Sequence, residues 1–265
     1  MTARRSPLAG FACLMLAAAA VVAAPRLAQA LPQGMEAVTL PEDVAGGGSQ
    51  AALALPQGGE DLPAVVLLYG QTASEQQVAE VAQELVRQDF AALAVPAPSG
   101  EAVSEEVVQA WVEWLRQRQE TAGRVGLMGW GEGGALALRS SLGAPVQAVV
   151  VYYADVALDA GRLADLNAPV LGHFATRDGV IDEPMVSTFQ DGMVRAGRSL
   201  ELFWYDADSG FADPAGDGHD AGAAAQAWTR TLGFLVEHLR TARAQGRTDP
   251  TEAPTQTETR ADPSQ

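Results

Sequence analysis

Between Leu31 and about Arg243 the chain alternates short apolar runs with longer stretches in which apolar residues recur every three or four positions. Short apolar runs are typical of strands buried on both faces of a sheet. A spacing of three to four, as in Val78, Val81 and Leu85, is typical of helices with one buried side. Because parallel strands need crossover connections, this alternation predicts a single α/β domain, with a mostly parallel sheet and helices on both faces.

The predicted strands are the apolar runs 64–69, 90–95, 125–128, 146–151 and 169–174. The predicted crossover helices are 75–87, 104–119, 132–142, 184–196 and 223–239. Two further strands, 36–40 and 50–55, flank the loop Gly46-Gly47-Gly48 and predict an antiparallel hairpin at the start of the domain. We expect this domain to span residues 31–243.

The two ends of the chain differ from the domain in composition. Arg4 and Arg5 precede an apolar run and the small-residue site Ala28-Gln29-Ala30, so residues 1–30 have the features of a secretory signal peptide. We expect cleavage after Ala30 and a secreted or periplasmic protein with no stable membrane anchor; an uncut signal that serves as an anchor is the alternative. Residues 244–265 are polar without apolar periodicity and predict a disordered tail.

Composition excludes several kinds of chemistry. All 17 basic residues are arginine, so Schiff-base and P-loop lysines are absent. Cys13, the one cysteine, lies in the expected signal peptide, so the processed chain has no disulfide and no thiolate nucleophile. After cleavage 14 arginines remain beside 33 acidic residues, a net charge of −19, which argues against nucleic acid as a partner. We expect no cofactor, no metal site, and a small molecule or a protein as partner.

One segment carries a motif: Val125-Gly126-Leu127-Met128-Gly129-Trp130-Gly131-Glu132-Gly133-Gly134 reads as a buried strand, a sharp glycine turn and a helix. This is the setting of the nucleophile elbow of α/β-hydrolases. The segment resembles the elbow of the dienelactone hydrolase family, which reads Gly-aromatic-Cys-x-Gly-Gly. The resemblance extends over about residues 51–239 and implies an α/β-hydrolase-type domain, with 64–69 leading into the oxyanion loop, 169–178 ending at the catalytic acid, 203–211 forming the histidine loop, and 227–235 lying in the last helix.

The resemblance also implies a catalytic triad, from which this chain departs. The family's nucleophile falls on Gly131 and its histidine on Ser209, so only the acid matches, at Asp178. A glycine offers neither a nucleophile nor a base, and acyl transfer needs both. The backbone N–H of Glu132 is expected to remain as one oxyanion donor.

Two further positions of the family are changed. The glutamate that controls the charge of the nucleophile in typical members falls on Gly70, and the arginine that holds the substrate carboxylate in some members falls on Asp213. The resemblance therefore implies the fold of the family, but most of the family's catalytic residues are replaced in this chain.

The vacated cleft is expected to gather several side chains, and the pocket candidates are Tyr69, Gln71, Trp130, Asp208 and His219. Glu132, Asp178 and Asp208 would then share one site, where like charges raise a carboxylate pKa or recruit a cation. Glu132 has a simpler alternative role, which is to stabilise the helix that it begins. His219 is the candidate substitute base, with a solvated loop residue as its alternative.

Three functions remain open on the sequence alone. The first is a secreted family member that is catalytically inactive and acts by binding or as a structural partner. The second is an active carboxyl-ester or lactone hydrolase with a relocated constellation, such as Ser209 or Glu132 with His219. The third is a periplasmic protein that binds a small cationic or neutral ligand in the vacated pocket.

Overall fold

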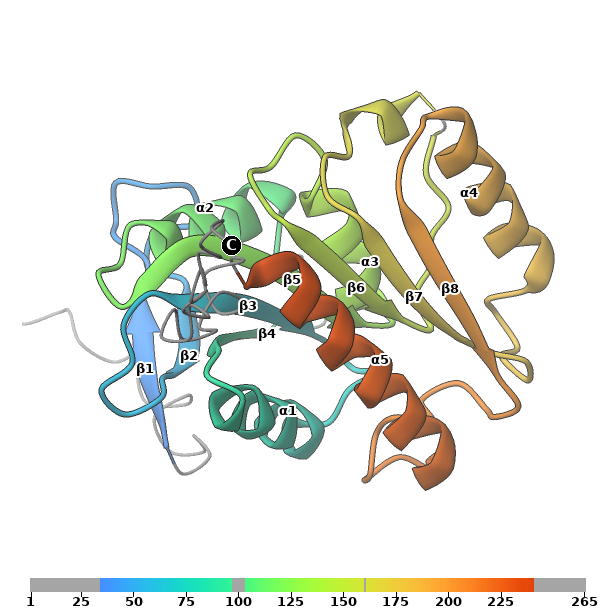
Figure 1. Ribbon diagram of the computed structural model, residues 1–265, viewed down its shortest axis with the longest axis horizontal. Coiled ribbons are helices and arrows are strands. Elements are labelled where there is room, and N and C mark those ends of the chain that lie inside the picture. Colours follow the sequence, from blue (N-terminus) through green and yellow to red (C-terminus); the bar gives the residue numbers. More distant parts are fainter. Residues whose placement is uncertain (1–33, 97–102, 160, 241–265) are drawn as a thin grey trace, which may run out of the picture.

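The computed structural model describes residues 34–96, 103–159 and 161–240 (Figure 1). The expected signal peptide and tail lie outside the described residues. The strands are β1 (Met35–Thr39), β2 (Gln50–Ala54), β3 (Leu62–Tyr69), β4 (Ala91–Pro96), β5 (Thr121–Trp130), β6 (Ala148–Tyr152), β7 (Val170–Ala175) and β8 (Leu200–Tyr205). The helices are α1 (Glu75–Arg87), α2 (Glu105–Arg116), α3 (Glu132–Ser140), α4 (Glu183–Arg195) and α5 (Ala221–Leu239), with a short 3₁₀ helix at Arg162–Asp165.

The eight strands form one sheet in the order β1-β2-β4-β3-β5-β6-β7-β8. Strands β3 to β8 are parallel to one another. Strands β1 and β2 form an antiparallel hairpin, and β2 joins the sheet antiparallel to β4. The predicted α/β domain with a mostly parallel sheet is therefore confirmed. Strand β8 was not among the predicted strands, because its half-exposed edge position leaves a mixed sequence, Leu-Glu-Leu-Phe-Trp-Tyr.

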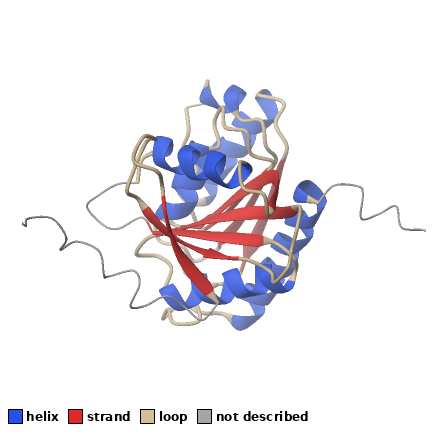
Figure 2. Ribbon diagram, turned by 90° about the vertical axis from the view of Figure 1, so that its left-hand side faces the viewer, coloured by secondary structure: helices blue, strands red, loops and turns tan. Residues whose placement is uncertain are grey.

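Helices cover both faces of the sheet (Figures 1 and 2). One hydrophobic cluster packs α2, α3 and α4 against one face through side chains such as Trp111, Leu136 and Phe189. The other cluster packs α1 and α5 against the opposite face through side chains such as Leu85 and Phe234. Burial on both faces explains why the central strands are continuous apolar runs.

The residues that precede α1 and α3 determine how each of these helices is capped. Ser74 precedes α1, and its hydroxyl accepts a hydrogen bond from the backbone N–H of Gln77 at 3.1 Å. Helix α3 has no such side-chain cap, because Gly131 occupies the capping position. The part of the chain that the structure describes contains no helix that is both long and apolar enough to span a membrane.

Candidate active site

The turn between β5 and α3 has the backbone of a nucleophile elbow. Gly131, at its centre, has φ 50° and ψ −117°, a conformation that L side chains rarely adopt. Its N–H donates to the carbonyl oxygen of Tyr152 at 2.9 Å, which fixes the turn against the neighbouring strand. The turn is also tight, because a Cβ on Gly133 would lie only 2.6 Å from the carbonyl carbon of Leu68. The glycine at 133 is therefore required by the close approach of α3 to β3.

Thr72 occupies the space in which the side chain of a nucleophile would lie. A Cβ built on Gly131 would come within 2.7 Å of the Cβ of Thr72, and nearer still to its hydroxyl oxygen. The Thr72 hydroxyl donates a hydrogen bond to the carbonyl oxygen of Trp130 at 3.0 Å. Thr72 is thus held at the elbow by a bond to the residue just before Gly131. The sequence analysis missed this role of Thr72.

The loop after β3 contacts the first residue of α3. The backbone N–H of Gln71 donates to Oε2 of Glu132 at 3.2 Å. In α/β-hydrolases a backbone N–H from this loop and the N–H of the residue after the nucleophile together form the oxyanion hole. Here the N–H of Gln71 is directed at a carboxylate of the same chain. Glu132 therefore binds the loop and lies at a helix N-terminus, where a negative charge is favoured.

Asp178 follows β7 and is the residue that the resemblance assigns to the catalytic acid. Its Oδ1 accepts hydrogen bonds from the backbone N–H groups of Val180 and Ile181, at 2.9 and 3.0 Å. Its Oδ2 is buried and has no hydrogen-bond partner among the described residues. The carboxylate is held in the way that a triad acid would be held, but no imidazole meets its second oxygen.

The histidine position and the candidate substitute base do not form a catalytic pair. Ser209 is exposed in the turn after β8. His219 is also exposed, and its Nδ1 lies 3.0 Å from the carbonyl oxygen of Phe211. Within the described ranges, no hydrogen bond joins His219 to Ser209 or to Glu132.

Glu132, Asp178 and Asp208, which were expected to share one site, each have a different partner in the structure. Asp208 is exposed and forms an ion pair with Arg177, whose Nε lies 2.9 Å from its Oδ1. Arg177 also pairs with Asp206, and the hydrogen bond to Asp208 raises the pKa of the Arg177 guanidinium. Arg177 precedes Asp178 in the sequence, and the sequence analysis did not identify it as the cation at this edge.

Asp213, at the position of the family's substrate-binding arginine, fastens its loop to α1. Its two carboxylate oxygens accept hydrogen bonds from the backbone N–H of Ser74 at 2.8 Å and from the Ser74 hydroxyl at 2.6 Å. A third bond comes from the backbone N–H of Ala215 at 2.9 Å. The side chain is buried. Asp213 is therefore a structural residue here, and its charge has the opposite sign to the family's arginine.

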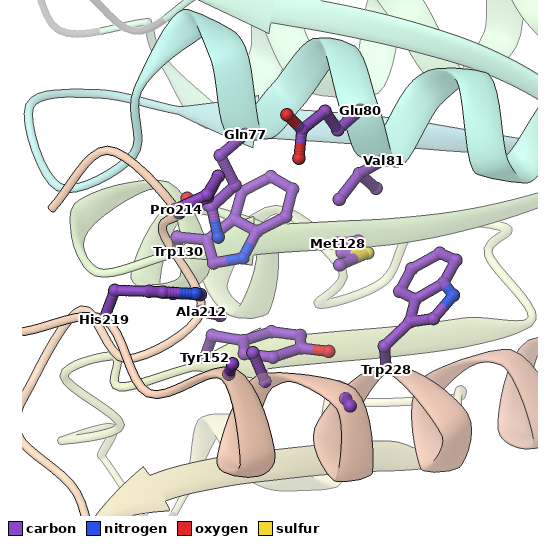
Figure 3. Close-up of a pocket in the computed structure, with 13 residues that line it drawn as sticks. Gln77, Glu80, Val81, Met128, Trp130, Tyr152, Ala212, Pro214, His219 and Trp228 are labelled. Carbon is purple, nitrogen blue, oxygen red and sulfur yellow. The ribbon is translucent and has the colours of Figure 1, made fainter.

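A cavity of about 360 Å³ opens beside the elbow, on the face of the sheet covered by α1 and α5 (Figure 3). Trp130 and His219 line it, as expected for pocket candidates, whereas Tyr69, Gln71 and Asp208 do not. Burial raises the pKa of Tyr69 to about 12, with a smaller contribution from the charge of Glu75. Residues of the cavity that the sequence analysis missed include Gln77, Glu80, Tyr152 and Trp228.

A buried histidine, His173, packs against Tyr152, one of the residues that line the cavity. His173 in β7 is fully buried, with Nδ1 at 2.9 Å from the Tyr205 hydroxyl and Nε2 at 3.0 Å from the Thr231 hydroxyl. The Thr231 hydroxyl also lies 2.7 Å from that of Tyr152. Burial, assisted by the charge of Arg230, lowers the pKa of His173 to about 3. His173 is thus a neutral core residue at physiological pH. Among the described residues, no three His, Cys, Asp or Glu side chains gather to hold a metal.

The sequence matches that of known hydrolases. Residues 92–239 match the sequence model of the dienelactone hydrolase family. The chain is 31% identical over 132 residues to a carboxymethylenebutenolidase from Pseudomonas putida, an alignment that covers 49% of this chain and about half (55%) of the relative. It is 26% identical over 221 residues to a Bradyrhizobium protein named "probable 2-oxo-3-(5-oxofuran-2-ylidene)propanoate lactonase", with coverage of 71% and 89%.

The fold matches solved structures as well. A dienelactone hydrolase-like promiscuous phosphotriesterase from metagenomic libraries aligns with a TM-score of 0.67 and 21% identity, over 78% of this chain and all of the other. An esterase from Thermogutta terrifontis aligns with a TM-score of 0.63 and 17% identity, over 77% and 94% of the two chains. At these identities the likeness concerns the fold alone.

Proposed function

This chain belongs to the dienelactone hydrolase family, and from that premise we propose that it is an exported member of the family without hydrolase activity. The observation that carries the proposal is the contact at the elbow. Gly131 supplies no nucleophile, and Thr72 fills the space into which one would project. The Thr72 hydroxyl donates its hydrogen bond to a backbone carbonyl oxygen and not to a base, so Thr72 is not activated as a nucleophile.

Three neighbouring features support the same proposal. The N–H of Gln71 is bound to Glu132, so a substrate oxyanion would have to compete with a carboxylate for this donor. Ser209 stands at the position of the histidine, and within the described ranges the buried Oδ2 of Asp178 lacks the partner that a triad acid orients. An intact oxyanion hole alone accelerates hydrolysis by about a thousand- to ten-thousandfold over water, but here the donor from the loop is bound to Glu132.

The test is hydrolysis of p-nitrophenyl acetate and of a cis-dienelactone by the purified, processed chain. We expect rates equal to those in buffer, and equal rates for the variants Ser209→Ala, Glu132→Gln and His219→Gln. Turnover that is lost in one of these variants would instead identify an active hydrolase with a relocated constellation. Turnover that survives all three would also contradict the proposal, and would place the chemistry elsewhere in the chain.

Export is a separate part of the proposal. It is supported by the order of Arg4 and Arg5, the apolar run and the Ala28-Gln29-Ala30 site. N-terminal sequencing of the form recovered from the periplasm or the medium should give Leu31 as first residue. Recovery of the chain in the membrane fraction with Met1 intact would contradict it.

A further inference from the structure

We propose that the cavity between α1 and α5 binds a small organic cation, an alkylated ammonium group, between its aromatic walls and Glu80. Its volume of about 360 Å³ lies in the range of small-molecule sites. Gly131, Thr72 and Asp178 are not part of its lining. The proposal therefore stands independently of whether the elbow is inactive.

Three aromatic rings form the apolar walls of the cavity (Figure 3). Trp130 from β5 and Tyr152 from β6 form the floor on the sheet side, with ring centroids 6.0 Å apart. They are only 0% and 2% exposed, so the ring face open to a ligand is that of Trp228. Trp228 approaches from α5 and is partly exposed. The faces of Trp and Tyr rings attract cations through their quadrupoles, and desolvation strengthens the attraction.

The charges around the cavity select for a cation. Glu80 of α1 extends toward the cavity, and one of its oxygens accepts a hydrogen bond from Gln76 at 2.9 Å (Figure 3). No arginine belongs to the lining, and the chain has no lysine. Arg87, in an adjoining cavity of about 250 Å³, is paired with Glu84. With a net charge of −16, the whole chain adds a potential of the same sign.

The polar side chains of the lining offer acceptors. His219 has Nδ1 at the carbonyl oxygen of Phe211, so in the neutral ring Nδ1 carries the proton and Nε2 is an acceptor. Gln77 is only 2% exposed, and its Oε1 has no hydrogen-bond partner in the described part of the chain. Its amide lies beside the Tyr153 hydroxyl, whose pKa is raised by burial. The Tyr153 hydroxyl can donate to this amide, so Nε2 of His219 is the acceptor of the lining that a ligand hydroxyl would meet.

The test compares choline with its uncharged carbon isostere, 3,3-dimethylbutan-1-ol, by isothermal titration calorimetry on the processed chain. We expect saturable binding of choline, with quenching of tryptophan fluorescence, and an affinity at least about tenfold above that of the alcohol. The variant Trp228→Leu should weaken choline binding about tenfold. The variant Glu80→Gln should weaken it about two- to fivefold and reduce its dependence on salt.

Two control variants make the same kinds of substitution outside the lining of the cavity. Glu75→Gln removes another carboxylate of α1, and Trp204→Leu removes an exposed tryptophan; neither residue belongs to the lining. Both controls should bind choline as the unmodified chain does. Glu80 is exposed, so Glu80→Gln gives an answer even where Trp228→Leu fails to fold. The proposal is overturned by the absence of saturable choline binding, by equal affinity for the alcohol, or by equal losses in Glu75→Gln and Glu80→Gln.

Discussion

The side chain of Thr72 lies where a side chain on Gly131 would have to stand, with Thr72 Cβ 2.7 Å from the position of the missing Cβ. The two residues meet because β3 and β5 are neighbours, so the loop that leaves β3 passes the end of β5. The glycine removes the reacting group, and the threonine fills the space that it leaves.

Replacing Gly131 with serine should lower the free energy of unfolding by more than backbone strain alone. The positive φ costs a side chain about 1–3 kcal/mol, and the clash with Thr72 adds to it. Urea denaturation measures the change. The control is Gly143→Ser, since Gly143 has φ +70° but nothing within 4 Å of an added Cβ. Equal losses for the two serine variants would contradict the assigned contact, as would a failure of Thr72→Ala to relieve part of the loss in Gly131→Ser.

Activity should be recoverable only when Thr72 is also removed. We expect Gly131→Cys with Ser209→His to hydrolyse p-nitrophenyl acetate at the rate of buffer, because the thiol has no room. Adding Thr72→Gly should give measurable hydrolysis, which adding Asp178→Asn should abolish, since nucleophile, base and orienting acid act as a unit. The gain should be modest because Gly70 leaves the thiol without the family's glutamate. Full activity of the variant that retains Thr72 would show that this residue does not obstruct the site.

The bond between Ser74 and Asp213 should contribute substantially to stability. Asp213→Asn keeps the shape but weakens three hydrogen bonds to a buried carboxylate, so we expect a loss of about 1–3 kcal/mol in the free energy of unfolding. Combining it with Ser74→Ala in a double-mutant cycle should give a coupling energy of about 0.5–3 kcal/mol. Asp217→Asn, in the exposed part of the same loop, serves as the control and should change stability little. A coupling energy near zero would contradict the assigned role.

His173 should make the fold sensitive to acid. Its pKa in the folded chain is about 3, below the value of about 6.5 in an unfolded chain, so between these values the unfolded state binds the proton more readily. Stability should therefore fall as pH decreases from about 6.5, by about 1.4 kcal/mol per pH unit from this group. The free energy of unfolding can be measured by chemical denaturation at several pH values between about 6.5 and 5. It should fall less steeply with decreasing pH in His173→Gln than in the unmodified chain. An identical pH dependence of the free energy of unfolding in both proteins would contradict the lowered pKa of His173.

Most of the fold could be predicted because the signals are local or periodic. The predicted bounds of α1 coincide with those observed, since Ser74 caps the helix and the apolar spacing ends with it. The central strands were found because burial on both faces makes them apolar throughout. Strand β8 has one partner strand and a partly exposed face, so its alternation is incomplete, and local pattern could not separate it from a loop.

The parts of the site that could be predicted are those determined by the local sequence. The glycines of the elbow follow from the turn itself, and Gly131 does adopt the positive φ. The contacts of Thr72 with Gly131, of Gln71 with Glu132 and of Arg177 with Asp208 join distant segments, and nothing in the local pattern indicates them. What the loop residues Gln71 and Thr72 contact depends on the tertiary structure.

The hydrogen bonds between Ser74 and Asp213 also set the width of the cavity, although neither residue lines it. Ser74 begins the helix that carries Gln77 and Glu80, and Asp213 lies between two residues of the opposite wall, Ala212 and Pro214. The two walls are thus fastened to each other beside the space that they enclose. Removing the hydrogen bonds between Ser74 and Asp213 would let the two walls separate. A ligand would then bind more weakly, because part of its binding free energy would be used to bring the walls together. The affinity of the cavity for the proposed ligand would therefore depend on Ser74 and Asp213, which do not line the cavity.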